Sequence, residues 1–169
     1  MTLRHRKLSV RDFDPDRAEP NEAANAWKVV SLSEGDGPES CTFLKQLSAI
    51  EPQFRQAAIV GVLRLLEVAA SGIQLANAYD KKRCHEIGHF LHDGSKHRLY
   101  RIRAGDTRLV FIYGPSREIC LCAALVKKQD KFTNAEMIEF ETAAKAHLEA
   151  LRKAIPRTVN QEKSHGKHR

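Results

Sequence analysis

Two short runs of alternating apolar and polar residues, separated by two residues typical of a tight turn, constrain the fold most strongly. Residues 99–104 and 107–113 have the period of two that is typical of β-strands. Gly105 and Asp106 lie between them and favour a two-residue hairpin turn. The sequence therefore predicts an antiparallel hairpin whose turn sets the register of its two strands.

Further elements are predicted on both sides of this hairpin. Residues 26–32 and 118–128 are rich in β-prone side chains and predict two more strands. Apolar residues at helical spacing predict one helix between Pro38 and Pro52 and a second helix over residues 53–71. We expect these two helices to form a helical hairpin.

The last part of the domain has the pattern of a capped amphipathic helix. Thr133 and Glu136 have the spacing of a capping box, and apolar residues then recur at helical spacing until Pro156. The predicted fold class is therefore α+β, with a small antiparallel β-sheet, an N-terminal helical hairpin and a C-terminal helix.

The two ends of the chain lack such patterns. Residues 1–26 contain Pro15 and Pro20 and alternate in charge without periodicity, so we expect a flexible N-terminal arm. Residues 156–169 are polar and basic and predict a flexible tail. The 169 residues then hold one domain, over residues 27–155.

Hydropathy and cysteine usage exclude several classes of protein. No stretch approaches the ~20 apolar residues of a membrane span, and the N-terminus lacks the apolar core of a secretory signal. The four cysteines have irregular spacing and no pairs at zinc-finger distance, so we expect buried thiols rather than disulfides or metal ligands. The sequence predicts a cytoplasmic protein that has no membrane partner, no metal and no cofactor.

The positive charge is concentrated in one block. The chain has a net charge of +7, and residues 81–131 alone hold twelve basic and five acidic side chains, which equals the whole excess. A field concentrated in this way favours a polyanionic partner such as nucleic acid. A solvated basic surface without a ligand is the simpler alternative.

Three arginines of this block are expected to share one face of the sheet. In the register that the turn predicts, Arg103 lies opposite Arg108 and Arg101 lies opposite Val110, and directly opposed residues point the same way. Like charges in opposed positions cost stability, whereas guanidinium groups suit phosphate oxygens. Arg101, Arg103 and Arg108 are therefore a candidate phosphate site, and the alternative is that they face solvent or pair with nearby carboxylates.

Other basic and imidazole side chains flank these arginines. The residues expected to contact RNA lie near the end of the predicted strand over residues 118–128 or just before the hairpin: Lys127, Lys131, Arg98 and His97. His92 and His97 have side chains that could donate or accept a proton near neutral pH. A charged strand end that prevents edge pairing would look similar.

The hairpin and the segment after it resemble the RelE/ParE superfamily of bacterial toxins, and more narrowly its HigB-like, phage-derived branch. The resemblance is carried by LYRIRAGDTRLVFIY at residues 99–113, by ICLCAALVKKQDKF at residues 119–132 and by the helix that follows. It extends over about residues 27–153. It implies the toxin of a type II toxin-antitoxin system, which inhibits translation as a ribosome-dependent, metal-independent mRNA endoribonuclease. A cognate antitoxin, of helix-turn-helix and HigA-like type, would neutralise it.

The resemblance also implies roles for particular residues. Arg101, Arg103 and Arg108 match the basic positions that grip and polarise the scissile phosphate, and Lys128 lies near a further basic position in the catalytic set. RelE-like members carry a tyrosine after the last strand, where this sequence has Phe132. That departure favours the alternative of a non-catalytic RNA-binding or partner-binding protein of the same fold. The target could be the ribosome or, as for ParE-like members, DNA gyrase.

A second motif points to different chemistry. His85, Glu86 and His89 match H-E-x-x-H, which on a helix binds Zn²⁺ through both histidines while the glutamate activates water. The run HEIGHFLH is also similar to the motif helix of ImmA/IrrE-type metallopeptidases. Charged residues before the motif, Gly88 within it and Asp93 after it disfavour a long helix. The alternatives are a zinc metallopeptidase and a chance match in the connection before the sheet.

Overall fold

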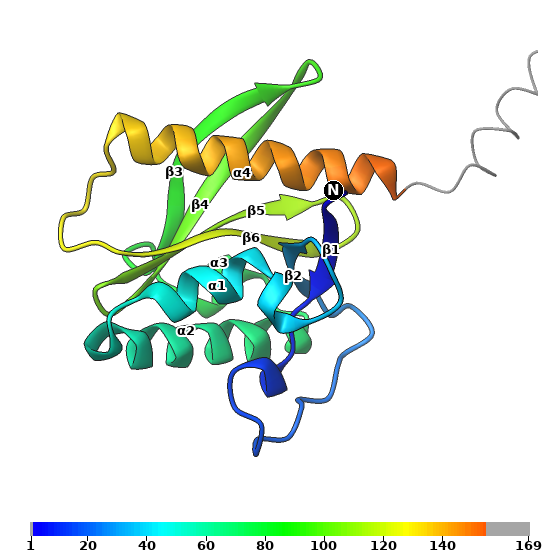
Figure 1. The fold of residues 1–169 in the computed structure, drawn as a ribbon, viewed down its shortest axis with the longest axis vertical. Helices are drawn as coiled ribbons and strands as arrows, with labels where there is room; N and C mark the ends of the chain where they lie inside the picture. Colours follow the sequence, from blue (N-terminus) through cyan, green and yellow to red (C-terminus); the bar gives the residue numbers. More distant parts are fainter. Residues whose placement is uncertain (1, 155–169) are drawn as a thin grey trace, which may run out of the picture.

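The predicted hairpin lies within a six-stranded, mostly antiparallel sheet (Figure 1). The structure, a computed structural model, describes residues 2–154. The strands follow the spatial order β1-β2-β6-β5-β4-β3, and only the pairing of β2 with β6 is parallel. Their bounds are β1 Arg4–Lys7, β2 Lys28–Ser33, β3 Cys84–His92, β4 Ser95–Ala104, β5 Thr107–Gly114 and β6 Glu118–Val126.

The register of the β4–β5 hairpin confirms the prediction from its turn. Arg103 pairs with Arg108, and Arg101 pairs with Val110. Gly105 has a φ of 61°, in the left-handed region, as a hairpin turn that begins with glycine requires. The three arginines therefore lie on one face of the sheet.

Helices cover both faces of the sheet (Figure 1). The helices α1 and α2 pack on one face, and α4 lies across the other. Gly72 ends α2 in the left-handed conformation, with a φ of 76°, as its position after the apolar repeat predicts. The helical elements are η1 Val10–Asp12, η2 Pro38–Ser40, α1 Thr42–Ala49, α2 Pro52–Ser71, α3 Leu75–Ala78 and α4 Asn134–Lys153.

Each layer of helices closes its own hydrophobic cluster. Phe43, Leu65 and Phe111 belong to the cluster between the sheet and α1 and α2. Val110 and Phe140 belong to the cluster under α4. Successive residues of β5 therefore serve opposite cores, which explains why the strand is apolar at nearly every position. Within residues 2–154, no helix combines the length and hydropathy that crossing a membrane requires.

The expectation of a flexible arm over residues 1–26 is wrong for its first half. Arg4–Lys7 forms the edge strand β1, which pairs with β2. Leu8 and Val10 follow it and are 2% and 1% exposed in the core under α2. The strand itself is entirely basic in sequence, RHRK, and is anchored by these two later residues, so hydropathy did not reveal it. The tail predicted over residues 156–169 lies outside the described residues.

The capping box at the start of α4 confirms another prediction and gives a direct test. The Thr133 hydroxyl accepts a hydrogen bond from the Glu136 amide at 3.1 Å, and the Glu136 carboxylate accepts one from the Thr133 amide at 2.8 Å. Replacing Thr133 by alanine is expected to lower the free energy of unfolding by about 1 kcal/mol, because an amide of the first turn loses its acceptor. Urea denaturation of Thr133→Ala and Thr133→Ser measures the effect. Equal losses in both variants would contradict it, since serine retains the cap.

Candidate nucleic-acid interface

The three hairpin arginines differ sharply in exposure. Arg101 and Arg108 are 3% and 1% exposed, whereas Arg103 is exposed to solvent. Arg103 stands between the other two, because it pairs with Arg108 across the hairpin and is two residues from Arg101 along β4. The structure therefore brings the three predicted arginines together. The guanidinium of Arg103 lies at the surface, and those of Arg101 and Arg108 lie beneath it. We call this group the arginine cluster.

The two buried arginines bond to backbone carbonyls. Nη1 of Arg101 donates to the carbonyl of Lys82 at 2.8 Å and to that of Arg83 at 3.3 Å. Nη1 of Arg108 donates to the carbonyl of Gly105 at 2.9 Å and to that of Thr107 at 3.2 Å. Both arginines thus hold connecting backbone in place, a structural role that the sequence pattern did not indicate.

Within residues 2–154, the positive charge of the arginine cluster has no direct counter-ion. Among the described residues, no carboxylate oxygen lies within 4.0 Å of a guanidinium nitrogen of Arg101, Arg103 or Arg108. Burial, and then the charge of Arg103, lower the pKa of Arg101 and of Arg108, while Asp130 acts in the opposite direction on both. The cluster is therefore an excess of positive charge in a partly desolvated place, which an anion would stabilise.

Two donor groups in the cluster also lack an acceptor. Nε of Arg101 and Nη2 of Arg108 are buried and make no hydrogen bond within residues 2–154. A buried donor without an acceptor costs about 1–3 kcal/mol, so the fold bears a cost to keep these two guanidinium groups beneath Arg103. At the exposed Arg103, phosphate oxygens are suitable acceptors, because guanidinium nitrogens bind them in pairs.

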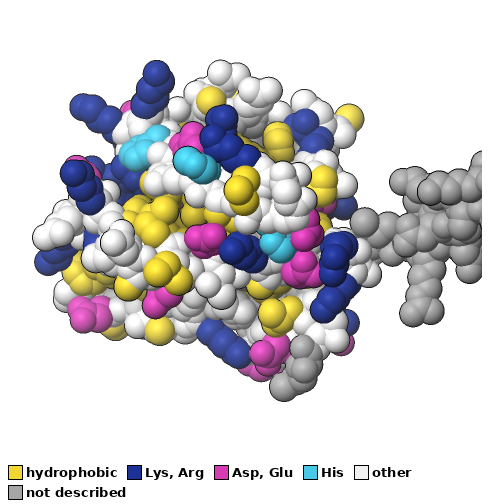
Figure 2. All heavy atoms as spheres, turned by 90° about the horizontal axis from the view of Figure 1, so that it is seen from above, with side chains coloured by type: hydrophobic (Ala, Val, Ile, Leu, Met, Phe, Trp, Pro, Cys, Tyr) yellow, Lys and Arg dark blue, Asp and Glu magenta, His cyan; other side chains and the backbone are white. Residues whose placement is uncertain are grey.

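Other basic side chains surround the cluster, and some of them are missing from the sequence prediction. Figure 2 shows Lys and Arg side chains around the end of the molecule where α4 begins, at the left of the view. The peptide before β3 is held against the cluster, since the Arg103 amide donates to the Arg83 carbonyl at 2.7 Å. Three exposed residues of this peptide therefore join the candidate interface: Lys81, Lys82 and Arg83. Their consecutive basic side chains were the sequence signal that could have identified them.

The predicted lysines have different surroundings. Lys128 and Lys131 are exposed, and Nζ of Lys128 lies 5.7 Å from the ring centre of Phe54. The side chain of Lys127 is only 13% exposed and pairs with Glu136 at 2.7 Å. That hydrogen bond is also the largest cause of the lowered pKa of Glu136. Lys127 therefore has a partner within the fold, whereas Lys128 and Lys131 remain available to an external anion.

The structure does not bring Arg98 and His97 to the arginine cluster. Arg98 lies on the opposite face of β4 from Arg101, because the two are an odd number of residues apart, and it faces Glu86 at 3.8 Å. His97 shares the face of Arg101 but lies about 13 Å away along the strand. It stacks on Phe90, with ring centres 5.5 Å apart. His92 is also remote, and its Nε2 contacts a carboxylate oxygen of Glu149 at 3.1 Å.

A pocket of about 580 Å³ opens beside Arg103. Its lining residues include Val60 of α2 and Ile102 of β4, together with Arg64, Arg83 and Arg103. Ile102 belongs to the core under α2, so this pocket lies on the face of the sheet opposite the arginine cluster. A pocket of this kind can accept a small group that has both a flat apolar part and negative charge.

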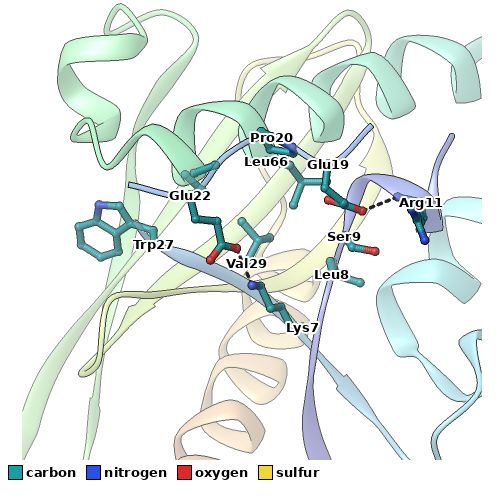
Figure 3. Close-up of a pocket in the computed structure, with 12 residues that line it drawn as sticks. Lys7, Leu8, Ser9, Arg11, Glu19, Pro20, Glu22, Trp27, Val29 and Leu66 are labelled. Carbon is teal, nitrogen blue, oxygen red and sulfur yellow. Dashed lines mark hydrogen bonds and ion pairs between the residues drawn. The ribbon is translucent and has the colours of Figure 1, made fainter. Parts of the chain in front are cut away.

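A second pocket, of about 460 Å³, is lined by basic and acidic side chains in equal number (Figure 3). It lies between the N-terminal segment and the core. Lys7 pairs there with Glu22 at 2.6 Å, and the Glu19 carboxylate accepts from the Arg11 amide at 3.1 Å. Its two basic side chains, Lys7 and Arg11, are matched in number by the carboxylates Glu19 and Glu22, so the pocket holds no excess of positive charge.

The metallopeptidase alternative is wrong in its structural premise. His85, Glu86 and His89 lie on the strand β3 and not on a helix. A β-bulge between Glu86 and Gly88 shifts the register, so that His85 pairs with Arg101 and His89 pairs with Arg98. Since Arg98 and Arg101 point to opposite faces, the two histidines do too and cannot share a zinc ion.

The sequence matches no protein-family model and no curated protein.

Proposed function

We propose that the chain is the toxin of a type II toxin-antitoxin system, of RelE/ParE and HigB-like type, which binds mRNA on the ribosome and cleaves it. The observation that supports this proposal is the arginine cluster, whose three guanidinium groups lack a carboxylate partner among the described residues. An mRNA phosphate bound at Arg103 would supply the missing negative charge. The protein would act in the cytoplasm and be neutralised by a helix-turn-helix antitoxin.

The exposed basic residues extend the cluster into a surface that fits a polyanion. Lys81, Lys82 and Arg83 lie on one side of the hairpin end, and Lys128 and Lys131 follow β6. Such a set contacts successive phosphates without reading bases, and the ribosome would supply the register.

The chemistry proposed for the cluster is electrostatic. Cleavage of RNA by its own 2′-hydroxyl places additional negative charge on the phosphate oxygens in the transition state. Arg103 is the group that can touch that phosphate, because it is exposed. Arg101 and Arg108 lie beneath it and add positive charge that needs no reorganisation during the reaction.

Non-catalytic RNA binding is the second candidate. It is favoured by the burial of Arg101 and Arg108, which are already bonded to backbone carbonyls, and by the phenylalanine that stands where RelE-like members have tyrosine. In this case Arg103 and the surrounding lysines would hold the phosphate backbone without cleaving it.

Induction of the protein in bacteria, with primer extension on the cellular mRNA, separates the two candidates. A ribonuclease is expected to arrest growth and to create new mRNA 5′ ends within translated regions. Co-expression of a cognate antitoxin should abolish both effects. Arrest with intact mRNA would contradict cleavage. Normal growth together with salt-dependent RNA binding by the purified protein would support the binding candidate instead.

A further inference from the structure

Three metal-binding side chains converge at the other end of the α4 face. His5 comes from β1, Cys120 from β6 and His147 from α4. One ligand atom from each of the three lies within 4.8 Å of the other two. The elements lie side by side in this region, because β2 alone separates β1 from β6 and α4 crosses above them (Figure 1). We call these residues the His-Cys-His cluster.

Hydrogen bonds fix the ring of His147 in an orientation that is common among metal-binding histidines. Nε2 of His147 lies 2.9 Å from the carbonyl oxygen of Leu121, which can only accept, so this nitrogen carries the proton. Nδ1 of His147 then accepts a hydrogen bond from Nε2 of His5 at 2.9 Å, and a metal ion would take the place of the proton between the two nitrogens. A histidine that donates one ring N–H to a backbone carbonyl and offers the other nitrogen is the usual arrangement around bound metals.

The surroundings of the cluster suit a buried cation site with access from the surface. Cys120 and His147 are 0% and 1% exposed, whereas His5 lies on the edge strand and is half-buried. A cation would therefore approach the enclosed Cys120 and His147 from the side of His5.

We propose that His5, Cys120 and His147 form a binding site for Zn²⁺, with a water molecule as the fourth ligand. Two imidazole nitrogens and one thiolate are the donor set that a borderline-soft cation prefers, and zinc accepts it in tetrahedral geometry. On binding, the Cys120 thiol loses its proton to solvent as the zinc–sulfur bond forms. No oxidation or reduction is involved.

Zinc would require the two histidine nitrogens to move slightly apart, with the Cys120 sulfur already within 4.8 Å of both. Zinc–nitrogen and zinc–sulfur bonds of about 2.0–2.3 Å place tetrahedral donors about 3.3–3.6 Å apart. The two histidine nitrogens are 2.9 Å apart. A shift of His5 on its edge strand would open that distance, since β1 pairs only with β2. The ion would then connect the N-terminal strand to the sheet and to α4.

A second group of three metal-binding side chains fits this cation less well. His92, Asp93 and Glu149 also have ligand atoms within 4.8 Å of one another, but Asp93 is exposed and two of the three donors are oxygens. Zinc binding by that group would therefore be weaker than at the buried sulfur-containing cluster.

The test uses the full-length protein after chelation, with Zn²⁺ and Co²⁺ as probes. One equivalent of Zn²⁺ is expected to bind, and at a free concentration of about 100 times the dissociation constant it should raise the melting temperature by about 5–10 °C. Co²⁺ is expected to give a thiolate-to-cobalt charge-transfer band, which reports the sulfur ligand directly.

Substitutions of single residues identify which side chains bind the metal ion. Cys120→Ala should abolish the cobalt–thiolate band, and His5→Gln should weaken zinc binding at least tenfold. The matched control Cys122→Ala removes the other thiol on the same strand and should leave both readouts unchanged, as should His85→Gln in the H-E-x-x-H motif. If Cys120→Ala fails to fold, His5→Gln decides the question, because that side chain lies at the sheet edge.

Three results would overturn the proposal. The first is the absence of a stoichiometric zinc ion in the wild-type protein. The second is zinc binding that survives both Cys120→Ala and His5→Gln. The third is binding that is lost when His165 and His168, which lie outside the described residues, are replaced by glutamine while the cluster is intact.

Discussion

Replacing Arg103 by alanine is expected to lower mRNA cleavage by about 10²-fold, because the variant loses the one cluster guanidinium that can touch the phosphate. The free energy of unfolding should change by no more than about 0.5 kcal/mol, since the side chain is exposed and, within the described part of the chain, makes no hydrogen bond or ion pair. Cleavage is measured by primer extension after induction, and stability by urea denaturation of the purified protein.

Two variants serve as controls for Arg103→Ala. Arg152→Ala removes another exposed arginine, at the far end of α4, and should leave cleavage unchanged. Arg103→Lys keeps the charge but loses the planar pair of donors, so an intermediate rate is expected. Equal cleavage by wild type and Arg103→Ala would remove Arg103 from the site, whereas equal losses in Arg103→Ala and Arg152→Ala would indicate a non-specific charge effect.

Arg108→Met tests the structural role of the buried Arg108. Arg108 is 1% exposed and bonds to the carbonyls of the β4–β5 turn, so this variant is expected to change stability as well as cleavage. Its cleavage rate is therefore interpretable only beside its unfolding curve. Arg103→Ala has no such ambiguity, and for that reason it is the primary test of the proposed site.

The sequence was sufficient for the hairpin because turn chemistry and strand period are local properties. Gly105 and Asp106 determined the register, and the register alone put Arg101, Arg103 and Arg108 on one face. Burial was not predictable in the same way. It depends on the backbone around Lys82 and Arg83 lying against Arg101, a contact between residues about 18 positions apart that no local pattern encodes.

The strand β3 was missed because its alternation is interrupted. The run CHEIGHFLH contains a bulge between Glu86 and Gly88, which shifts the side chains after it to the other face. A period of two is therefore not visible over the whole strand, and the same run matches a metal motif by composition. The His-Cys-His cluster was equally hidden, because His5 and His147 are separated by 142 positions in the chain.

Replacing Leu8 by alanine is expected to lower the free energy of unfolding by about 2–5 kcal/mol, which tests whether the N-terminal segment belongs to the folded domain. Leu8 is 2% exposed, packs in the core cluster that includes α2, and donates its amide to the Val29 carbonyl at 2.8 Å. A flexible arm would predict almost no change, because a mobile leucine loses no packing when it is shortened.

The matched control is Leu91→Ala, in which the same substitution is made at a side chain that is 68% exposed near the tip of the β3–β4 hairpin. It is expected to change the free energy of unfolding by less than about 0.5 kcal/mol. Both variants are compared with wild type by urea denaturation in the presence of a chelator, so that zinc bound through His5 cannot compensate for a weakened β1. A loss in Leu8→Ala no larger than in Leu91→Ala would mean that β1 separates from the sheet before global unfolding, and His5 would then be too mobile to hold a zinc ion in place.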